Sequence, residues 1–535
     1  MVRPMTPARA LLATALLLAL AGPARAGNLD HERPKLVVVL VVDQMRADYL
    51  GRFADRLLPA VGPDGRPGGF RRVIDQGAYW PVARHDVYQA MTGPGHASIA
   101  TGAWPARSGI TLNNWWQGES FMYCVGDPSA TNLPDDGTGK DRSIGLANLV
   151  APTLGDTLKS HPVGGSVVSI SLKDRAAALL GGHRADTVLW FDSKALRWTT
   201  STYWTEELPA WVAELNTGPR GGQDLFLTHG GNDAVVEAAL AAVDAQSMGR
   251  DDRPDLLLLG LSALDYLGHE VGPDAPEVGD MIVSVDAALA ALFAGLEQRL
   301  GSLDEVVLAV TADHGAPRVP EVMAEEGLPA GRILEPATEQ ELEALLVGAL
   351  GAPAGASWIG GMYRGNVWFR ADSVADPATR HAAEEAVRAA LLELPGVDEV
   401  LTASDLDAGR FPPGPPGERL ANQYRSGRSA DVIAGMRPLW ISTSYTYGVS
   451  HMTRYAYDTT VPLAIAGPGI GSGRHATPAT VIDLAPTLAW LLDILPPASA
   501  EGRVLSEALS PPALDSSSEA GSGRAPRKRS RRGTP

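Results

Sequence analysis

The chain of 535 residues is poor in cysteine, in aromatic side chains and in positive charge. Cys124 is its single cysteine, so no disulfide can form within the chain and a small disulfide-stapled fold is excluded. Aromatic residues make up only 6% of the sequence, but 45% of it is hydrophobic, which is enough for a sizeable core. We therefore expect one large globular core that carries insertions.

Basic residues are outnumbered by acidic ones, 45 to 62, and the formal net charge is −17. Without the six basic residues near the carboxyl terminus, the charge on the rest would be −17 − 6 = −23. An acidic body argues against nucleic acid as a partner. It leaves room for a small anionic substrate, because a bound metal can dominate the local field. The six residues are Arg524, Arg527, Lys528, Arg529, Arg531 and Arg532.

The longest feature of the amino terminus is an apolar run over residues 10–21, preceded by Arg3 and Arg9. The run is followed by Ala24-Arg25-Ala26, a small-x-small cleavage pattern, so residues 1–26 are predicted to be a signal peptide. A membrane span needs about 20 apolar residues, so we expect no stable span and an exported protein, periplasmic or secreted. An uncleaved membrane anchor is the alternative.

Near-continuous apolar segments at 35–42, 255–260, 305–310 and 461–466 alternate with alanine-rich stretches at 234–245, 286–299 and 382–394. This alternation predicts a layered α/β/α fold with a mostly parallel central sheet, which binds ligands at the carboxyl ends of its strands. We expect a catalytic domain over residues 27–509, with insertions at about 104–204 and 362–431. Residues 510–535 are expected to form a disordered basic tail, and the protein is expected to be a monomer.

Carboxylates and histidines gather just past the predicted strands. Asp265 and His269 are four residues apart and would share one face of a helical turn. A single histidine after a strand is usually structural, but a whole set of such groups favours a metal site. Mixed aspartate and histidine ligands suit zinc, with manganese and iron as alternatives. The set is Asp43, Asp265, His269, Asp313, His314 and His451.

Thr92 begins the segment Thr92-Gly93-Pro94-Gly95-His96-Ala97-Ser98, which allows a tight turn into a helix. A hydroxyl at a helix amino terminus lies where backbone N–H groups favour an anion, although taken alone Thr92 would be a helix cap. Lys173 and Arg175 are two residues apart and would point the same way on an extended segment. Taken alone, they would be a solvated surface pair. His96 is expected beside the site, and His85 has no assigned role.

These segments together resemble the alkaline phosphatase superfamily, in its zinc-dependent branch with a threonine nucleophile, which is related to nucleotide pyrophosphatases/phosphodiesterases. The resemblance extends from Lys35 to about Leu492, and its motifs occur in the family's order. Besides the Thr92 segment they are Val42-Asp43-Gln44-Met45-Arg46, Gly109-Ile110, Asn113-Asn114-Trp115, Ser171-Leu172-Lys173-Asp174-Arg175, Asp265-Tyr266-Leu267-Gly268-His269, Ala312-Asp313-His314-Gly315, Tyr457-Asp458 and Val461-Pro462-Leu463.

The resemblance implies two Zn²⁺ ions and a secreted alkaline phosphatase that hydrolyses small phosphate monoesters through a phosphothreonine at Thr92. It implies that one zinc is held by Asp265, His269 and His451, and the second by Asp43, Asp313 and His314, with the Thr92 oxygen between substrate and metal. Substrate contacts would come from Gly93, Asn113, Lys173 and Arg175. In this branch the Lys-x-Arg pair binds the oxygens of a dianionic monoester. A monoester carries more charge than a diester, so it gains more from charge-assisted hydrogen bonds to the two cations.

Two positions depart from the family's pattern: Arg428 stands in a segment that commonly ends in aspartate, and Met452 follows His451 where relatives often have glycine. Three other functions stay open. A diesterase on the same fold is disfavoured by Lys173 and Arg175. A sulfatase is disfavoured because Thr92 cannot become formylglycine. A non-catalytic metal-binding protein is the third.

Overall fold

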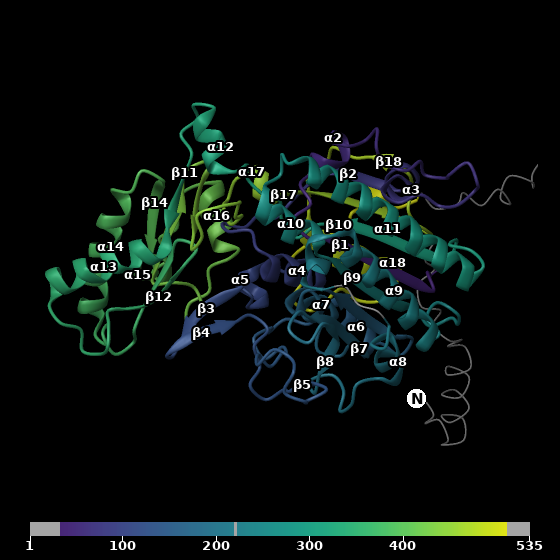
Figure 1. The fold of residues 1–535 in the computed structure, drawn as a ribbon, viewed down its shortest axis with the longest axis horizontal. Helices are drawn as coiled ribbons and strands as arrows, with labels where there is room; N and C mark the ends of the chain where they lie inside the picture. Colours follow the sequence, from purple (N-terminus) through teal and green to yellow (C-terminus); the bar gives the residue numbers. More distant parts are fainter. Residues whose placement is uncertain (1–32, 219–221, 511–535) are drawn as a thin grey trace, which may run out of the picture. The chain divides into compact units, whose positions relative to one another are not determined.

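The computed structural model describes residues 33–218 and 222–510, so the expected signal peptide and residues 511–535 of the expected tail lie outside the described residues. Residues Arg33–Ser510 form one compact unit built around an 11-stranded sheet (Figure 1). In sheet order its strands are β18 (Gly473–Arg474), β2 (Ala78–Arg84), β17 (Thr460–Ala466), β10 (Val306–Thr311), β1 (Leu36–Val42), β9 (Asp255–Leu261), β6 (Val167–Ser171), β7 (Thr187–Asp192), β8 (Arg197–Ser201) and β5 (Asn132–Leu133), with β19 (Ala479–Thr480) beside β2.

The centre of this sheet is parallel. Val38 of β1 lies opposite Leu308 of β10 on one side and Leu257 of β9 on the other. All residues of these three strands are buried, as expected for strands that are covered on both faces. The predicted α/β fold is confirmed, although β17 runs antiparallel to β10.

Helices cover both faces of the sheet. On β7, Thr187 accepts a hydrogen bond from Gln246 at the end of α9 (His229–Ala245), whereas Val188 packs against Gly181 of α7 (Asp174–Gly181). Successive side chains of a strand point to opposite faces, so α9 and α7 lie on opposite sides. Further helices packed on the sheet or on these two are α3 (Phe70–Gln76), α4 (Thr92–Thr101), α6 (Leu154–Ser160), α10 (Ala263–Val271) and α11 (Pro276–Leu300), and α18 (Leu484–Leu491) packs on α4.

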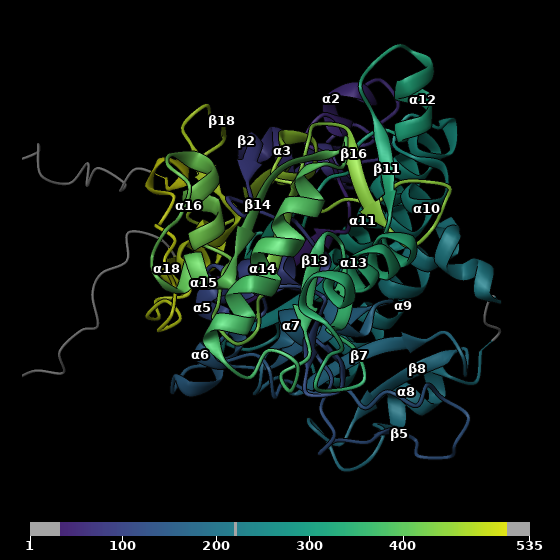
Figure 2. The same cartoon turned by 90° about the vertical axis from the view of Figure 1, so that its left-hand side faces the viewer.

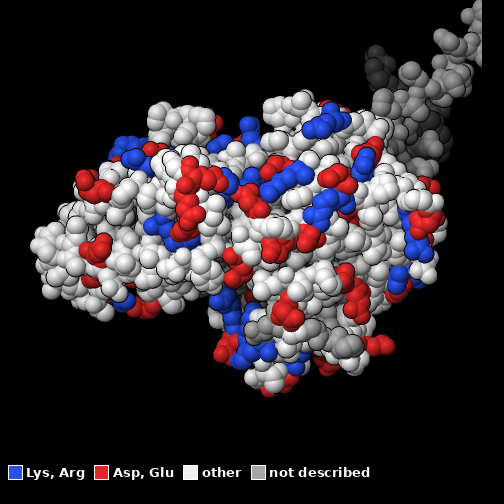
Figure 3. Space-filling view, turned by 45° about the horizontal axis from the view of Figure 1, so that its top comes forward, with Lys and Arg blue, Asp and Glu red and all other residues white. Residues whose placement is uncertain are grey.

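Helix α11 is the one helix among the described residues that is long and apolar enough to cross a membrane. Of its most apolar 18-residue window, 61% is buried inside the protein, where Ile282, Leu289 and Phe293 belong to the main core. Its apolar character is therefore accounted for by packing inside the protein, against α9, α10 and α3. On the face of the molecule shown in Figure 3, acidic and basic side chains are interspersed.

A second, four-stranded antiparallel sheet has the order β12 (Ile359–Tyr363), β13 (Asn366–Phe369), β15 (Val432–Met436) and β14 (Val397–Thr402). Helices α13 (Glu335–Leu350) and α14 (Pro377–Leu392) lie in front of these strands in Figure 2. They bury a separate core with the sheet, including Leu346, Val387 and Val432. We call this sheet with α13 and α14 the small lobe.

The small lobe extends beyond the expected insertion at 362–431, because β12 starts at Ile359 and β15 ends at Met436. The expected insertion also contains the short helix α16 (Pro415–Ala421). Much of the other expected insertion, 104–204, belongs to the main sheet. It supplies β6, β7 and β8, because their buried apolar residues pair with β9 and with one another. Outside the sheet this segment forms a hairpin of β3 (Asn114–Gln117) and β4 (Ser120–Tyr123).

The remaining elements are short. They are β11 (Gly331–Leu334), which pairs in parallel with β16 (Trp440–Thr443), the helices α2 (Tyr49–Arg52), α5 (Pro105–Ser108), α8 (Ala210–Leu215), α12 (Pro320–Glu325), α15 (Ala403–Asp407) and α17 (Ala456–Thr459), and the 3-10 turns η1 (Gln223–Leu227), η2 (Val481–Asp483) and η3 (Ser506–Ala508).

Candidate functional site

Three adjacent parallel strands carry carboxylates at the same edge of the sheet. Asp43 directly follows β1, Asp313 lies two residues after β10, and Asp265 sits in the first turn of α10, which follows β9. Because parallel strands end at one edge, these three side chains converge there, and all three are buried. Buried carboxylates are costly unless cations or hydrogen-bond donors compensate them.

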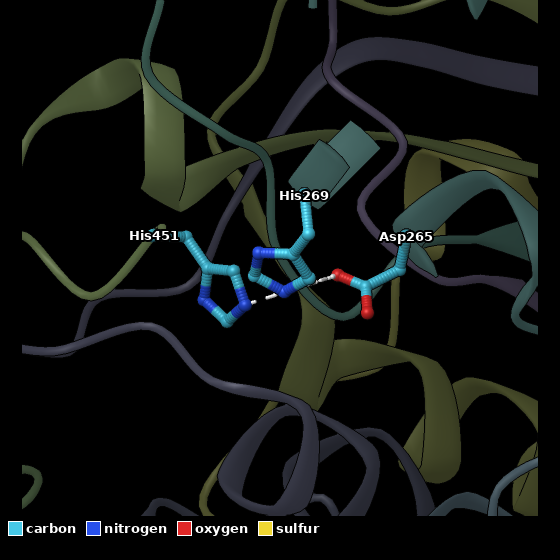
Figure 4. A group of neighbouring side chains, drawn as sticks. All are labelled: Asp265, His269 and His451. Carbon is cyan, nitrogen blue, oxygen red and sulfur yellow. Dashed lines mark ion pairs between the residues drawn. The ribbon is translucent and has the colours of Figure 1, made fainter. Parts of the chain in front are cut away.

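The first group of possible metal ligands is Asp265, His269 and His451. The Asp265 Oδ1 atom lies 3.3 Å from Nε2 of His269, one helical turn away, and 3.8 Å from Nε2 of His451. Figure 4 shows both imidazole rings turned toward the carboxylate. His451 comes from the segment between β16 and α17, so this loop adds a third possible ligand to the two that α10 supplies.

Backbone carbonyls orient all three histidines of the site. The Nδ1 atom of His269 lies 2.7 Å from the Val449 oxygen, that of His451 lies 2.9 Å from the Ala90 oxygen, and that of His314 lies 2.9 Å from the Gly315 oxygen. A carbonyl can only accept, so each Nδ1 carries a proton, and in the neutral ring the Nε2 atom is the one left with a lone pair. This arrangement is typical of metal-binding histidines.

The second group consists of Asp43, Asp265 and His314, whose ligand atoms lie within 4.8 Å of one another. The resemblance implied Asp313 in place of Asp265. In the structure Asp313 borders this group: its Oδ2 lies 3.4 Å from Nε2 of His314, and its Oδ1 accepts the Gln44 N–H at 3.1 Å. Asp265 therefore lies between the two groups.

The site has the chemistry of a cation site. Within the described part of the chain, Oδ1 of Asp43 and Oδ2 of Asp313 are buried and accept no hydrogen bond. Two such oxygens beside imidazole Nε2 atoms match the mixed oxygen and nitrogen donor sets of transition-metal ions. The residues present therefore fit one or two divalent cations.

Burial shapes the titration of these groups. Burial, together with the charge of Asp43, raises the pKa of Asp313 well above its usual range. Burial lowers the pKa of His314 and of His451 well below 6.5, which keeps both imidazoles neutral and able to bind metal. Burial also opposes the charged form of Asp265, but the neighbouring His269 and Lys173 outweigh it and hold its pKa well below the usual value.

Thr92 lies beside the second group. Helix α4 begins at Thr92, and the cap position belongs to Met91, with no side-chain capping bond. The Thr92 Oγ1 atom lies 3.4 Å from Nε2 of His314 and accepts a 3.4 Å contact from Nη2 of Arg175. The hydroxyl is therefore turned into the site, and its role is not that of a helix cap.

Asn113 is fixed at the amino terminus of α4. Its Oδ1 accepts the Gly93 N–H at 2.7 Å, so its Nδ2 group is the end available to another acceptor. A Cβ atom at Gly93 would lie only 2.9 Å from this Oδ1 and 3.0 Å from Sγ of Cys124. Glycine at this position is what allows Asn113 to approach the backbone next to Thr92.

Lys173 and Arg175 both reach the site, but the expected extended segment is wrong. Lys173 is the residue before α7, and Arg175 is in the first turn of that helix, because β6 ends at Ser171 and the helix already starts at Asp174. The Lys173 ammonium contacts Asp265 and lies 2.6 Å from Oδ2 of Asp43. Arg175 instead contacts Thr92. The pair thus serves two different parts of the site.

Two further residues hold the site together: Gln44, to which sequence reasoning gave no role, and His96, which was expected beside the site. Gln44 donates from Nε2 to Oδ1 of Asp265 at 2.7 Å. Buried His96 lies with its Nδ1 2.9 Å from the Thr92 oxygen and 3.2 Å from Oδ2 of Asp313. Gln44 lies within a resembling motif, next to Asp43, and this adjacency was the one available signal.

The loop that carries His451 is held by Asp458, whose Oδ2 accepts the N–H groups of Met452 and Thr453 at 3.0 and 2.7 Å. Met452 has φ of 113°, a backbone conformation that favours glycine. Methionine is therefore strained at this position, where the sequence departs from the family's usual glycine. The other departure, Arg428, donates from Nη1 to the Asn148 oxygen at 2.6 Å and so braces a loop.

A cavity of about 230 Å³ opens beside these groups. The described residues that line it contribute polar and cationic side chains and no carboxylate. The lining residues are Asn113, Asn114, Tyr123, Arg142, Arg175, His269, Tyr363, Arg364, Ser450, His451 and Met452.

Comparison with known proteins agrees with this geometry. A family model described as type I phosphodiesterase / nucleotide pyrophosphatase matches residues 37–456. Alkaline phosphatase PafA of Elizabethkingia meningoseptica is 29% identical, covering 94% of this chain and 100% of its own. Alkaline phosphatase PhoV of Synechococcus elongatus is 28% identical, covering 89% and 93%.

The crystal structure of wild-type PafA superimposes with a TM-score of 0.81 at 28% identity, covering 89% of this chain and 99% of that one. The resemblance drawn from the motifs is thereby confirmed. The chain belongs to the type I phosphodiesterase / nucleotide pyrophosphatase family, within the alkaline phosphatase superfamily.

Proposed function

We propose that the protein is an alkaline phosphatase that hydrolyses small phosphate monoesters, with Thr92 as the nucleophile. The observation that carries this proposal is the position of Thr92, whose Oγ1 lies within 3.4 Å of both a candidate metal ligand, His314, and a guanidinium, that of Arg175. The relatives named alkaline phosphatase, which match nearly the whole chain, support the same activity.

Two Zn²⁺ ions are proposed as the cofactors. Asp265, His269 and His451 would hold one, and Asp43 and His314, with Asp313 beside them, would hold the other. When bound, zinc would lower the pKa of the Thr92 hydroxyl and stabilise negative charge on the departing oxygen. The donor set of aspartates and histidines supports zinc over softer or purely oxygen-ligated metals.

The reaction proceeds in two displacements. The Thr92 Oγ1 atom gives up its proton to solvent and forms a bond to phosphorus while the bond from phosphorus to the ester oxygen breaks, and the departing oxygen takes a proton from solvent to leave as the alcohol. Water then attacks the phosphothreonine, the bond from phosphorus to Oγ1 breaks, and inorganic phosphate leaves as the hydroxyl is restored. Arg175 and the Nδ2 group of Asn113 donate to the non-bridging oxygens, where negative charge develops.

Preference for monoesters over diesters follows from charge. A monoester dianion carries more charge than a diester and gains more from Arg175 and from the ammonium of Lys173. A diesterase is the second candidate, since the family's description includes phosphodiesterases. Lys173→Ala should lower kcat/KM for a monoester much more than for the corresponding diester. Equal losses would favour the diesterase.

The deciding experiment compares 4-nitrophenyl phosphate, bis(4-nitrophenyl) phosphate and 4-nitrophenyl sulfate as substrates of the zinc-loaded protein. Wild type should hydrolyse the monoester best, Thr92→Ala should lose that activity, and Thr92→Ser should keep part of it. Thr138→Ala, at an exposed threonine, is the control. Metal content is measured on each sample. Full turnover by metal-loaded Thr92→Ala would refute the nucleophile, and zinc binding without turnover by wild type would favour a non-catalytic metal protein.

We propose that the protein is exported, on the sequence of residues 1–26. We also propose that it is a monomer. Amino-terminal sequencing of the mature protein should begin at Gly27, and the protein should appear in the periplasmic or secreted fraction. An intact amino terminus in the cytoplasmic fraction would refute export. Sedimentation of a stable dimer would refute the monomer.

A further inference from the structure

The cavity beside Thr92 is cationic beyond what the proposed reaction needs. Arg175 contacts Thr92, but two further arginines, Arg142 and Arg364, also line the cavity. Resting on the proposed function, we propose that Arg142 and Arg364 form a second anion site, selecting phosphate monoesters whose leaving group carries another phosphate or a carboxylate.

Arg364 is presented by the small lobe at a tight turn. It lies with Gly365 between β12 and β13, and the two residues have φ of 55° and 76°. Positive φ at both central positions is typical of a two-residue hairpin turn. Asparagine, aspartate and glycine are the usual residues there, so arginine at this position carries a conformational cost.

The tip of this hairpin is fastened to the segment that carries the nucleophile. Gln89, three residues before Thr92, donates from Nε2 to the Arg364 backbone oxygen at 3.0 Å. Its Oε1 accepts from Nδ2 of Asn366 at 3.0 Å. Arg364 is therefore held in register with Thr92 although more than 270 residues separate them in sequence.

The Arg364 guanidinium has few partners of its own. It lies over the rings of Tyr363 and Tyr445, with distances of 5.6 and 5.2 Å to the ring centres, and Nη1 donates to the Ser442 oxygen at 3.3 Å. Nε is buried, and no described residue accepts from it. Glu335 binds the backbone N–H of Arg364 at 2.6 Å, but among the described ion pairs none involves the Arg364 guanidinium. A half-buried cation that has no ion pair among the described residues favours an anionic ligand.

Arg142 approaches the cavity from a different part of the chain, the connection between β5 and α6. Its guanidinium stacks 3.9 Å from the ring centre of Tyr123, and within the described residues it forms no ion pair. The Tyr123 hydroxyl in turn lies 3.4 Å from Nη1 of Arg175. Tyr123 thus sits between the arginine that faces Thr92 and an arginine that is free to meet the rest of the substrate.

Size limits what the cavity can hold. Its volume of about 230 Å³ is below the roughly 300–1,000 Å³ of pockets that enclose drug-sized ligands. A compact leaving group of a few carbons fits, whereas a larger one would extend into solvent. The absence of any carboxylate among the described lining residues contrasts with a net charge of −17 for the whole chain. The second anion of the substrate should therefore lie close to its ester.

The test compares two substrates with the same three-carbon skeleton. In 2-phosphoglycerate a carboxylate replaces one CH₂OH group of glycerol 2-phosphate. We expect wild type to have a higher kcat/KM for 2-phosphoglycerate, by about tenfold for each charge-assisted contact. Arg364→Met and Arg142→Met should each lower the ratio of the two kcat/KM values by about tenfold, mainly through KM, and the double variant should bring it near one.

Arg410→Met is the matched control, because Arg410 is an exposed arginine between β14 and β15 with a 62% exposed side chain, outside the cavity lining. It removes the same charge and should leave the ratio unchanged. If Arg364→Met fails to fold, the exposed position of Arg142 keeps the test decisive. A wild-type ratio of one or less, or a ratio that neither variant changes, would overturn the second anion site. Failure to hydrolyse either substrate, or hydrolysis that persists in Thr92→Ala, would instead overturn the proposed function.

Discussion

Replacing Lys173 with methionine removes the cation that compensates two buried carboxylates. The Lys173 ammonium contacts Asp265 and lies 2.6 Å from Oδ2 of Asp43, and its side chain is only 2% exposed. Methionine keeps most of the length and apolar surface of the lysine stem, so the substitution changes charge more than packing. The change therefore isolates the electrostatic part played by Lys173 from its part in packing.

Removing one partner of a buried ion pair typically costs about 3–5 kcal/mol, since the other charge stays buried without a counterion. We expect the metal-free Lys173→Met protein to lose about that much free energy of unfolding. If zinc binds Asp43 and Asp265, it compensates the same carboxylates, so the loss in the zinc-loaded protein should fall to less than half of this value.

Urea unfolding of wild type and variant, each with a chelator and with zinc, measures both numbers. Lys194→Met is the control, because Lys194 pairs with Asp141 at the surface with a 51% exposed side chain, and such pairs contribute about 0–1 kcal/mol. An equal loss with and without zinc would show that the metal does not bind at these carboxylates. A loss below about 1 kcal/mol in chelator would contradict the burial of the ion pair.

Three further outcomes are expected. Gln44→Met, which removes the donor to Asp265, should weaken zinc binding by about 10- to 100-fold in a chelator competition, and unchanged affinity would contradict a supporting role. In urea unfolding, Met452→Gly should have a free energy of unfolding about 1 kcal/mol higher than Met452→Ala. Both variants lose the methionine side chain, but only alanine keeps the strain of φ at 113°, so the reverse order would refute the strain. Burial lowers the pKa of His85 to about 4, so below pH 6.5 the unfolded chain takes up a proton at this residue that the folded chain does not. The free energy of unfolding therefore decreases as the pH is lowered. His85→Gln should reduce the loss between pH 7 and pH 5 by about 2 kcal/mol in urea titrations, and an unchanged slope would contradict the assignment.

Local sequence patterns predicted the frame of the site well. The apolar runs at 35–42, 255–260 and 305–310 were predicted as parallel strands, and the structure has β1, β9 and β10 there, side by side. A run of buried apolar residues depends on neighbours in sequence, so it is visible without the fold. The spacing of Asp265 and His269 likewise predicted one helical face, and in α10 the two lie one turn apart with their side chains in contact.

Contacts between distant segments could not be predicted in this way. Asp265 lies within reach of both ligand groups and Asp313 borders His314, and neither position can be read from the spacing of residues along the chain. The start of α7 at Asp174 sends Lys173 toward the carboxylates and Arg175 toward Thr92, where an extended segment was expected. Local spacing gives no information on either direction.

By itself the sequence determined the fold class, the strand ends that carry carboxylates, and the family to which the chain belongs, since these depend on periodicity and on motifs within short segments. Only the tertiary structure decided which ligands converge, and that a hairpin of the small lobe brings Arg364 to the cavity beside Thr92. The physical reason is that a binding site is made by side-chain packing between segments hundreds of residues apart, whose distances no local pattern records.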